Sequence, residues 1–129
     1  MAKTFPEELR YAATHEWVRV QGDIAEMGIS AYAVEEMGDL TYVELPRVGA
    51  EFRKGDPIGV VESVKDTFDI FAPVSGQVTE VHKELATELD TVGRDPYGAG
   101  WLIRLRLGNP QEVGTLLSAS DYAAKVSRD

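Results

Sequence analysis

The sequence predicts a mostly β domain, either a small barrel or a sandwich, with short helices appended, mostly at the C-terminus. Short β-rich runs follow one another at close spacing, and turn residues rich in Gly and Pro separate them. One later run, WLIRLRL, alternates between apolar and polar side chains as a half-buried strand does. With 43% hydrophobic residues, a chain of 129 residues can build one core without metals or disulfides. We therefore expect a single domain over residues 1–129, with a β core over about 17–107 and C-terminal helices over about 110–127.

The first third of the chain should form a helical turn, a β-hairpin and a short helix. Thr4 has capping-box spacing to Glu7, which indicates a helical turn at the start. The run HEWVRVQGDIAEMGI predicts two strands joined at residues 21–23, where a central glycine makes the turn easy. Ser30 can cap a helix over AYAVEEM, and Gly38 is expected to end that helix in the left-handed conformation.

The middle of the chain is expected to consist of strands separated by tight turns. DLTYVELP reads as a strand closed by Pro46, and turn residues follow at 47–49, 54–57 and 73–76. The segments PRVGAEFRKGDPIGVV and APVSGQVTEV lie on either side of Lys65, and both run from proline through glycine into β-formers. Two such units would fit a pseudo-symmetric sandwich with this lysine at one end.

The run WLIRLRL predicts the last strand. Arg104 and Arg106 should point to one side, and the apolar residues of the run should point to the other: Trp101, Ile103, Leu105 and Leu107. This pattern favours core packing for Trp101, although Trp101 and Tyr97 could also contribute to a surface that binds a partner.

Two short helices are predicted after this strand. Asn109 can cap the first, with Pro110 at the first helical position and Glu112 three residues after the cap. Ser118, followed three residues later by Asp121, can start the second.

The charge and composition of the chain exclude several classes of partner. Acidic residues outnumber basic ones by 22 to 13, for a formal net charge of -9, so nucleic acid and anionic membranes are not expected partners. A protein with a basic patch is a better expectation. The start of the chain lacks the features of a signal or transit peptide, and no apolar run approaches the roughly 20 residues that span a bilayer. We expect a soluble cytoplasmic protein.

No side-chain pattern predicts catalysis or metal binding. The two histidines, His15 and His82, are far apart and belong to no catalytic or metal-binding motif. His82 reads as a surface residue at a strand end, whereas His15 is either a partly buried residue at a strand start or part of a site. The chain has no cysteine and no nucleotide-binding glycine motif. We therefore predict no catalytic residue and no metal site.

Lys65 is the most informative single residue. It lies in VVESVKDTFDIFAPVSG, residues 60–76, at the tip of what reads as a tight hairpin. Most exposed lysines only add charge to a surface. A lysine on a rigid turn, however, is what a modifying ligase can recognise and what a covalently attached swinging cofactor needs. An amide-linked carrier group would project roughly 10 to 15 Å from the backbone, counting bond lengths.

Around Lys65 the sequence resembles the H protein family of the glycine cleavage system. Residues 61–65, VESVK, and 72–76, APVSG, are similar to the lipoylation hairpin of that family. YAATHEWVRVQGDIAEMGIS resembles its opening, GDLTYVELPRVGAEFRKGDPIGVVESVK its centre, and DPYGAGWLIRL its last strand. Biotin carriers typically present Ala-Met-Lys-Met at this turn, and lipoyl domains of 2-oxo acid dehydrogenases present Thr-Asp-Lys-Ala. The turn here reads Ser-Val-Lys-Asp at residues 63–66. The Glu-Ser-Val-Lys flank at residues 62–65 and the DPYGAGW segment both favour the H protein family.

The resemblance implies a barrel-sandwich hybrid fold, as in lipoyl and biotinyl domains, with lipoate in amide linkage to Lys65. Glu62, Ser63 and Val64 would form the turn that a lipoate ligase or a lipoyl or octanoyl transferase recognises. The resemblance further implies a non-catalytic carrier that visits three enzymes, and we expect a monomer because such a shuttle must visit several partners in turn. Pyridoxal-phosphate glycine decarboxylase would load an aminomethyl group, a tetrahydrofolate-dependent aminomethyltransferase would remove its carbon, and FAD-dependent dihydrolipoyl dehydrogenase would reoxidise the thiols.

The resemblance also implies a cleft in which the loaded arm rests. In the family, a glutamate of the His-Glu-Trp motif and an aspartate four residues after the lipoyl lysine line this cleft. The matching residues here are Glu16 and Asp69, and Thr14 lies where the family often has a small hydroxyl residue. Carboxylates suit a cationic amine, and exclusion of water would slow loss of the carbon as formaldehyde. Without the resemblance, both carboxylates would read as solvated strand-end charges.

The residues after Lys65 depart from the family pattern. Asp66-Thr67-Phe68 stands where small residues such as alanine and serine are common, so this side of the turn is more acidic and bulkier. Two other readings of the chain remain beside the shuttle. One is a lipoate relay or storage carrier outside glycine catabolism, and the other is an unmodified interaction module in which Lys65 is only a charged tip.

Overall fold

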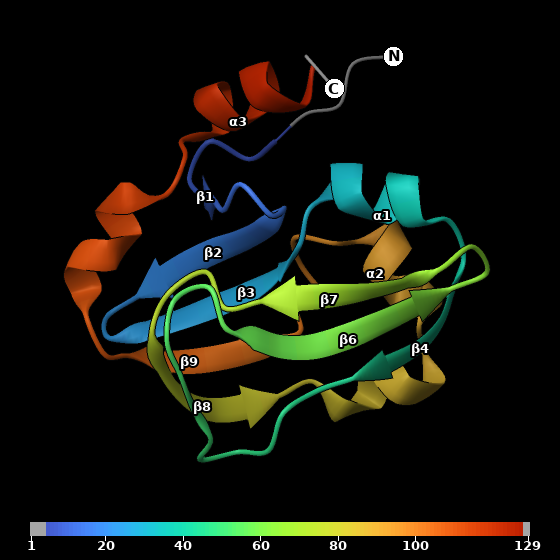
Figure 1. Cartoon of the computed structure of the whole chain (residues 1–129), viewed down its shortest axis with the longest axis horizontal. Coiled ribbons are helices and arrows are strands. Elements are labelled where there is room, and N and C mark those ends of the chain that lie inside the picture. The colour runs from blue at the N-terminus through green and yellow to red at the C-terminus, as the bar shows by residue number, and fades with distance from the viewer. Residues whose placement is uncertain (1–4, 128–129) are drawn as a thin grey trace.

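The computed structural model describes residues 5–127, and within them nine strands form two antiparallel sheets. The six-stranded sheet has the order β1-β2-β3-β9-β8-β5, and the three-stranded sheet, β4-β6-β7, lies in front of it in Figure 1. The strands are β1 (Arg10–Tyr11), β2 (Glu16–Gln21), β3 (Ile24–Ile29), β4 (Leu40–Glu44), β5 (Glu51–Phe52), β6 (Pro57–Ser63), β7 (Thr67–Phe71), β8 (Gly76–Val81) and β9 (Ile103–Leu107). The prediction of a mostly β fold with appended helices is confirmed.

The predicted N-terminal hairpin is present as β2 and β3. Its strands pair from Glu16 with Ile29 to Gln21 with Ile24, and Gly22 makes the turn with a φ of 63°. Such a positive φ is easy for glycine because it has no Cβ. The predicted helical turn at the start depends on Thr4, which lies outside the described residues. From Phe5 onward the structure has a turn before β1, in which the N–H of Leu9 donates to the carbonyl of Pro6 at 3.3 Å.

The helix α1 (Ala31–Met37) follows this hairpin and is capped as predicted. The side chain of Ser30 accepts a hydrogen bond from the backbone N–H of Ala33. Gly38 ends the helix as predicted and has the expected positive φ, 81°, but its ψ of -154° lies outside the left-handed helical region. The extended ψ directs the chain straight into β4, which begins two residues later.

Short helices follow the strands β8 and β9. A 3₁₀ helix η1 (Lys83–Thr87) and a short helix α2 (Asp90–Arg94) occupy a stretch without a predicted element. After β9 come the 3₁₀ helix η2 (Pro110–Thr115) and the helix α3 (Ala119–Val126), both with the predicted caps. Glu112 was expected to support the cap of η2, but its carboxylate instead accepts hydrogen bonds from the backbone N–H and hydroxyl of Ser75.

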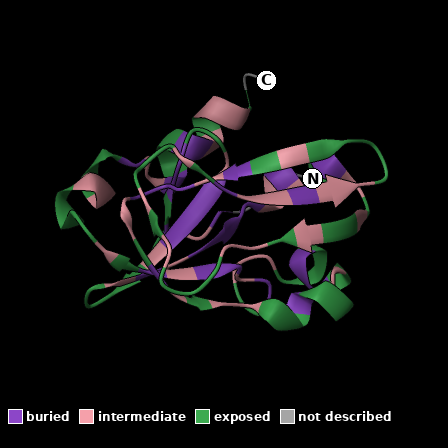
Figure 2. Cartoon of the chain, turned by 60° about the horizontal axis from the view of Figure 1, so that its bottom comes forward, coloured by how far each residue is buried: buried purple, intermediate pink, exposed green. Residues whose placement is uncertain are grey.

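The main core lies between the two sheets, where Val18, Met27, Val61, Ile70 and Leu105 are all buried. Figure 2 shows the buried residues along the inner strands, with exposed residues on loops and outer helix faces. A second, largely aromatic cluster joins the N-terminal segment and β2 to α3. Its buried members are Phe5, Leu9, Tyr11, Trp17, Ala119 and Tyr122.

Trp101 departs from the predicted alternation. Ile103 and Leu105 are fully buried as expected, but the strand begins only at Ile103, and Trp101 lies before it and is half-buried. The guanidinium of Arg104 lies 3.9 Å from the centre of the Trp101 ring, and the His82 ring stacks on the same indole at 4.4 Å. Trp101 therefore packs beside polar groups at the edge of the aromatic cluster. Within residues 5–127, no helix combines the length and the apolar character needed to cross a membrane.

Candidate functional site

The hairpin of β6 and β7 presents Lys65 on a turn that side chains hold closed. The N–H of Ser63 donates to the carbonyl of Asp66 at 2.9 Å, and the Ser63 hydroxyl oxygen accepts from the N–H groups of Lys65 at 3.2 Å and Asp66 at 3.3 Å. The carboxylate of Asp66 in turn accepts from the N–H of Thr67 at 2.8 Å. Asp66, one of the residues that depart from the family pattern, therefore supports the turn.

The turn is also fixed to the end of α1. The N–H of Val64 donates to the carbonyl of Asp39 at 3.0 Å, and the exposed Lys65 side chain places its Nζ 2.8 Å from the carbonyl oxygen of Glu36. Carbonyls in the last turn of a helix lack partners within the helix and carry partial negative charge, so a cation is stabilised there. The Val64 side chain beside it is 67% exposed, which leaves an apolar contact point next to the lysine.

A cavity of about 260 Å³ adjoins this end of α1. Its walls come from the start of β2, from α1 and from β7, and its lining residues are Thr14, His15, Glu16, Ile29, Tyr32, Ala33, Glu36, Met37, Phe68 and Asp69. The structure thus brings together all three residues predicted to dock the arm, although 55 positions separate Thr14 from Asp69. Glu36 belongs both to the cavity wall and to the contact with Lys65. The lysine is therefore held at the margin of the cavity.

Glu16 is the most unusual group in the cavity. Only 1% of the residue is exposed, and burial raises the pKa of its carboxyl to about 7. The Thr14 hydroxyl donates to one carboxylate oxygen, and the N–H of Phe71 donates to the other at 3.1 Å. Both hydrogen bonds favour the ionised form and limit the rise in pKa. Near neutral pH, a cation that enters the cavity would therefore meet a carboxyl that it can readily ionise.

Asp69 and Phe68 give the cavity a charged rim and an apolar wall. Asp69 is an exposed residue of β7 that pairs with Val60 of β6. Phe68, the bulkiest departure from the family pattern, is half-buried and packs against the main core. Its side chain also lines the cavity, to which it contributes an apolar wall.

The structure adds residues to the site that the sequence did not identify. From α1 come Tyr32, Ala33, Glu36 and Met37. His15, for which two roles were open, is a half-buried residue that lines the cavity, and its Nδ1 lies 2.7 Å from the hydroxyl of Tyr122. No signal in the sequence could pair these two residues, because 107 positions separate them. His82 does not line the cavity; it is half-buried, with Nδ1 2.7 Å from the carbonyl oxygen of Trp101.

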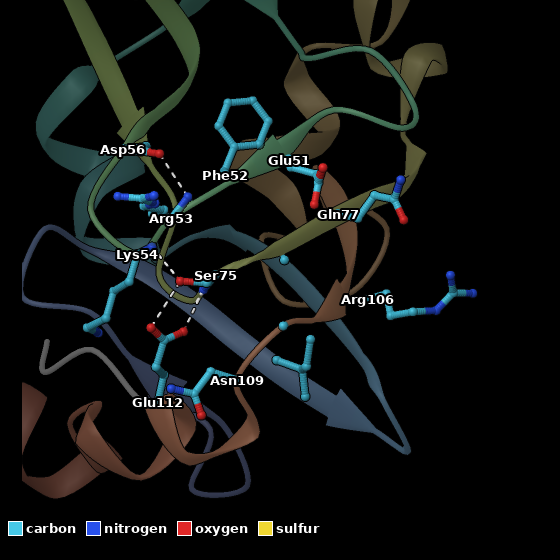
Figure 3. Close-up of a pocket in the computed structure, with 13 residues that line it drawn as sticks. Glu51, Phe52, Arg53, Lys54, Asp56, Ser75, Gln77, Arg106, Asn109 and Glu112 are labelled. Atoms are coloured by element: carbon cyan, nitrogen blue, oxygen red, sulfur yellow. Dashed lines mark hydrogen bonds between the residues drawn. The ribbon is translucent and has the colours of Figure 1, made fainter.

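A larger groove of about 830 Å³ lies elsewhere on the molecule, over β5, β8, β9 and η2. Figure 3 shows Glu112 reaching from η2 to Ser75, where its two hydrogen bonds to that residue close one side of the groove. The side chains around it carry both signs of charge, among them Lys54, Arg106 and Asp56. None of the residues predicted to carry or dock a cofactor lines this groove.

Comparison with known proteins identifies the family. The sequence model of the family described as glycine cleavage H-protein matches residues 9–129. The glycine cleavage system H protein of Synechococcus sp. (strain JA-3-3Ab) is 48% identical over 126 residues, which cover 98% of each chain. That of Rubrobacter xylanophilus is 47% identical over 124 residues, which cover 96% of each chain.

A solved structure extends the likeness to the fold. The crystal structure of a glycine cleavage system H protein from Mycobacterium marinum matches with a TM-score of 0.88 and 40% sequence identity. The match covers 95% of the present chain and 99% of the other. It confirms the predicted barrel-sandwich hybrid fold. With matches in sequence and in structure over nearly its whole length, the chain belongs to the glycine cleavage H-protein family.

Proposed function

We propose that this protein is the lipoyl-carrying shuttle of a glycine cleavage system, with lipoate in amide linkage to Lys65. One observation carries the proposal: the exposed Lys65 amine, on a turn fixed to α1, contacts the carbonyl of a residue that also lines the cavity with Glu16 and Asp69. Lipoate supplies a dithiol that carries the aminomethyl group. An arm of roughly 10 to 15 Å from the backbone could swing from this margin into the cavity or out toward an enzyme.

The hairpin supports attachment of the cofactor. Ser63 fixes the backbone around Lys65, and the exposed Val64 offers an apolar contact next to the acceptor amine. Glu62, half-buried and paired with Thr67 just before the turn, completes the recognition surface. A lipoate ligase or a lipoyl or octanoyl transferase would read this surface. A rigid turn lowers the entropy that such an enzyme must remove when it binds.

The cavity supports protection of the cargo. A primary amine on the arm is cationic near neutral pH, and Glu16 and Asp69 would attract it from two walls of the cavity. Thr14 holds the Glu16 carboxylate by donating its hydroxyl hydrogen. Because Glu16 is almost fully buried, its attraction for a cation is less screened by water than that of a surface carboxylate. Enclosure by Phe68 and Met37 would keep water from the carbon that the arm carries.

This function makes the protein a non-catalytic component that works with other enzymes. The partners would be a pyridoxal-phosphate glycine decarboxylase, a tetrahydrofolate-dependent aminomethyltransferase and an FAD-dependent dihydrolipoyl dehydrogenase. The net charge of -9 favours encounter with basic surfaces on these enzymes. We propose that the protein acts as a monomer in the cytoplasm, because one hairpin must reach three enzymes in turn.

Mass spectrometry of the protein from its own source tests the attachment. Intact mass followed by peptide mapping over residues 60–76 should show one lipoyl increment on Lys65, and Lys65→Arg should show none. An unmodified Lys65 in cells with active lipoylation would instead support the interaction module. Reconstitution with the decarboxylase and aminomethyltransferase tests the pathway: lipoylated protein that glycine cannot load would point to a lipoate relay or storage carrier.

A further inference from the structure

The C-terminal helix α3 places one polar group, the hydroxyl of Tyr122, next to a residue that lines the cavity. The hydroxyl of Tyr122 lies 2.7 Å from His15 Nδ1 and 2.7 Å from the Ser30 Oγ. Tyr122 is fully buried, and burial raises the pKa of its hydroxyl, so this group is neutral at physiological pH. A neutral hydroxyl can donate to one of these partners while it accepts from the other. Tyr122 therefore links two segments that are far from α3 in the sequence.

The two partners of Tyr122 belong to segments that form different walls of the cavity. His15 itself lines the cavity and immediately precedes Glu16. Ser30 is the N-cap of α1, which supplies a second wall, and its Oγ accepts from the N–H of Ala33 at 3.1 Å. The N–H of Ser30 also donates to the carbonyl of His15 at 2.9 Å. A shift of the Tyr122 hydroxyl would thus change the positions of residues in both walls.

His15 adopts a backbone conformation that needs such support. Its φ is 85°, in a region that residues with a Cβ rarely occupy. Conformations of this kind persist when surrounding contacts hold them, and they recur at binding and active sites. Here the hydrogen bond between the His15 ring and the Tyr122 hydroxyl, and the bond that the His15 carbonyl accepts from the Ser30 N–H, supply this support. The position of Glu16, the next residue, depends on it.

The aromatic cluster fixes Tyr122 from the other side. Its ring stacks on Tyr11 with centroids 4.7 Å apart and planes inclined by 7°, and the Phe5 ring meets its edge at 4.9 Å. The Tyr11 hydroxyl donates to the carbonyl of Pro6 at 2.8 Å, away from His15 and Ser30. Two stacked tyrosines in one cluster thus have hydroxyls with different partners, and this makes Tyr11 a natural control for Tyr122.

We propose that Tyr122 is a positioning residue for the arm-docking cavity, holding the His15–Glu16 segment and the N-terminus of α1 at the spacing that encloses the loaded arm. The inference rests on the proposed function, because it concerns how well the docked arm is protected. Tyr122 does not itself line the cavity; it acts through His15, which does, and through Ser30 at the start of α1.

The test compares Tyr122→Phe with Tyr11→Phe in full-length, lipoylated protein. Each variant keeps the ring and removes one buried hydroxyl, so the packing of the cluster is preserved. Both proteins are loaded with glycine and the decarboxylase and then freed of that enzyme, and release of formaldehyde from the arm is timed. Tyr122→Phe should release it roughly 2- to 10-fold faster than the parent, the factor that corresponds to one neutral hydrogen bond. Tyr11→Phe should match the parent, and both variants should be lipoylated as fully as the parent.

A spectroscopic readout separates positioning from a general loss of stability. The ring ¹⁵N resonances of His15 should shift in Tyr122→Phe and stay in place in Tyr11→Phe, because the Tyr122 hydroxyl lies at hydrogen-bond distance from that ring whereas the Tyr11 hydroxyl bonds to Pro6. Equal release rates in the two tyrosine variants, or an unchanged His15 signal in Tyr122→Phe, would overturn the inference. If Tyr122→Phe does not fold, Ser30→Ala removes the same link from the side of α1, and Ser30→Thr, which keeps a hydroxyl, should restore slow release.

A second comparison keeps this inference separate from the proposed function. The double variant Glu16→Gln, Asp69→Asn removes both docking carboxylates without touching Tyr122. If its release rate equals that of the parent, arm docking itself is wrong. If the double variant is fast while Tyr122→Phe stays slow, docking stands and only the role of Tyr122 is refuted.

Discussion

Glu16 should make the stability of this protein fall as pH rises toward neutrality. Burial raises the pKa of its carboxyl to about 7 in the folded protein, whereas the unfolded chain has the ordinary value of 4.5. Between these values the folded state holds a proton that the unfolded state has lost. The contribution is therefore fully present below 4.5 and disappears as pH rises through about 7. At about 1.4 kcal/mol per pKa unit, its loss between about pH 5 and about pH 8 amounts to about 2 to 3 kcal/mol.

Urea denaturation of the parent and Glu16→Gln measures this effect. Gln is neutral at every pH, and its amide can donate to Thr14 while its oxygen accepts from the N–H of Phe71, so both contacts of Glu16 can persist. Free energies of unfolding extrapolated to water at several pH values give one curve for each protein. The two curves should approach each other at acid pH and separate by about 2 to 3 kcal/mol toward pH 8, with the variant more stable there.

The difference between these curves isolates Glu16, because all other titrating groups are shared. Parallel curves from pH 5 to pH 8 would refute the claim that the carboxyl is buried at a cost. Thr14→Val provides a second check on the cause. The Thr14 hydroxyl favours the ionised form, so its removal should move the midpoint of the stability loss to higher pH. A midpoint that stays in place would show that this hydrogen bond does not control the titration.

Three further changes test the hairpin and the core. Lys65→Arg should abolish lipoylation but alter the free energy of unfolding by no more than about 0.5 kcal/mol, as is usual for an exposed side chain; a large loss in urea denaturation would mean that the lysine is structural. Ser63→Ala removes the hydroxyl that holds the turn and should slow lipoylation in an assay with purified ligase, at a cost in stability of about 1 kcal/mol; an unchanged rate would show that the turn needs no such support. Gly28→Ala would place a Cβ 2.7 Å from Trp17 Nε1, so it should lower stability by about 1 to 3 kcal/mol, and a neutral result would mean that the indole can move aside.

The sequence was most informative where structure depends on neighbouring residues. The caps at Ser30, Asn109 and Ser118 form as predicted, because a side-chain oxygen beside free N–H groups is a local feature. The hairpin around Gly22 forms for a similar reason. Glu16, Asp69 and Thr14 were placed in one site through the family resemblance, and the cavity brings them together. Alternation of side chains alone would have left them as separate strand ends.

The remaining features depend on contacts between distant segments. Glu112 has the spacing of a capping residue, yet Ser75 offers it an N–H and a hydroxyl, and these two donors outweigh the single N–H of the cap. Trp101 fits an alternating pattern but precedes the strand, where Arg104 and His82 cover its faces. The link between Tyr122 and His15 forms only once α3 packs on the N-terminal segment, so no local pattern can reveal it.

In the unmodified protein, the contact between Lys65 and α1 competes with the binding of the Lys65 amine by an attaching enzyme. An attaching enzyme needs a free amine, and in this structure the Lys65 amine donates a hydrogen bond to the carbonyl of Glu36. The apparent affinity of the enzyme is then reduced by the fraction of molecules in which the lysine is detached. Because the contact is exposed to solvent and weak, the free energy that separates the attached and detached lysine is small and depends on salt concentration. Ionic strength should therefore influence the rate at which newly made protein is lipoylated. The cause is a contact at the end of α1, which takes no part in the chemistry itself.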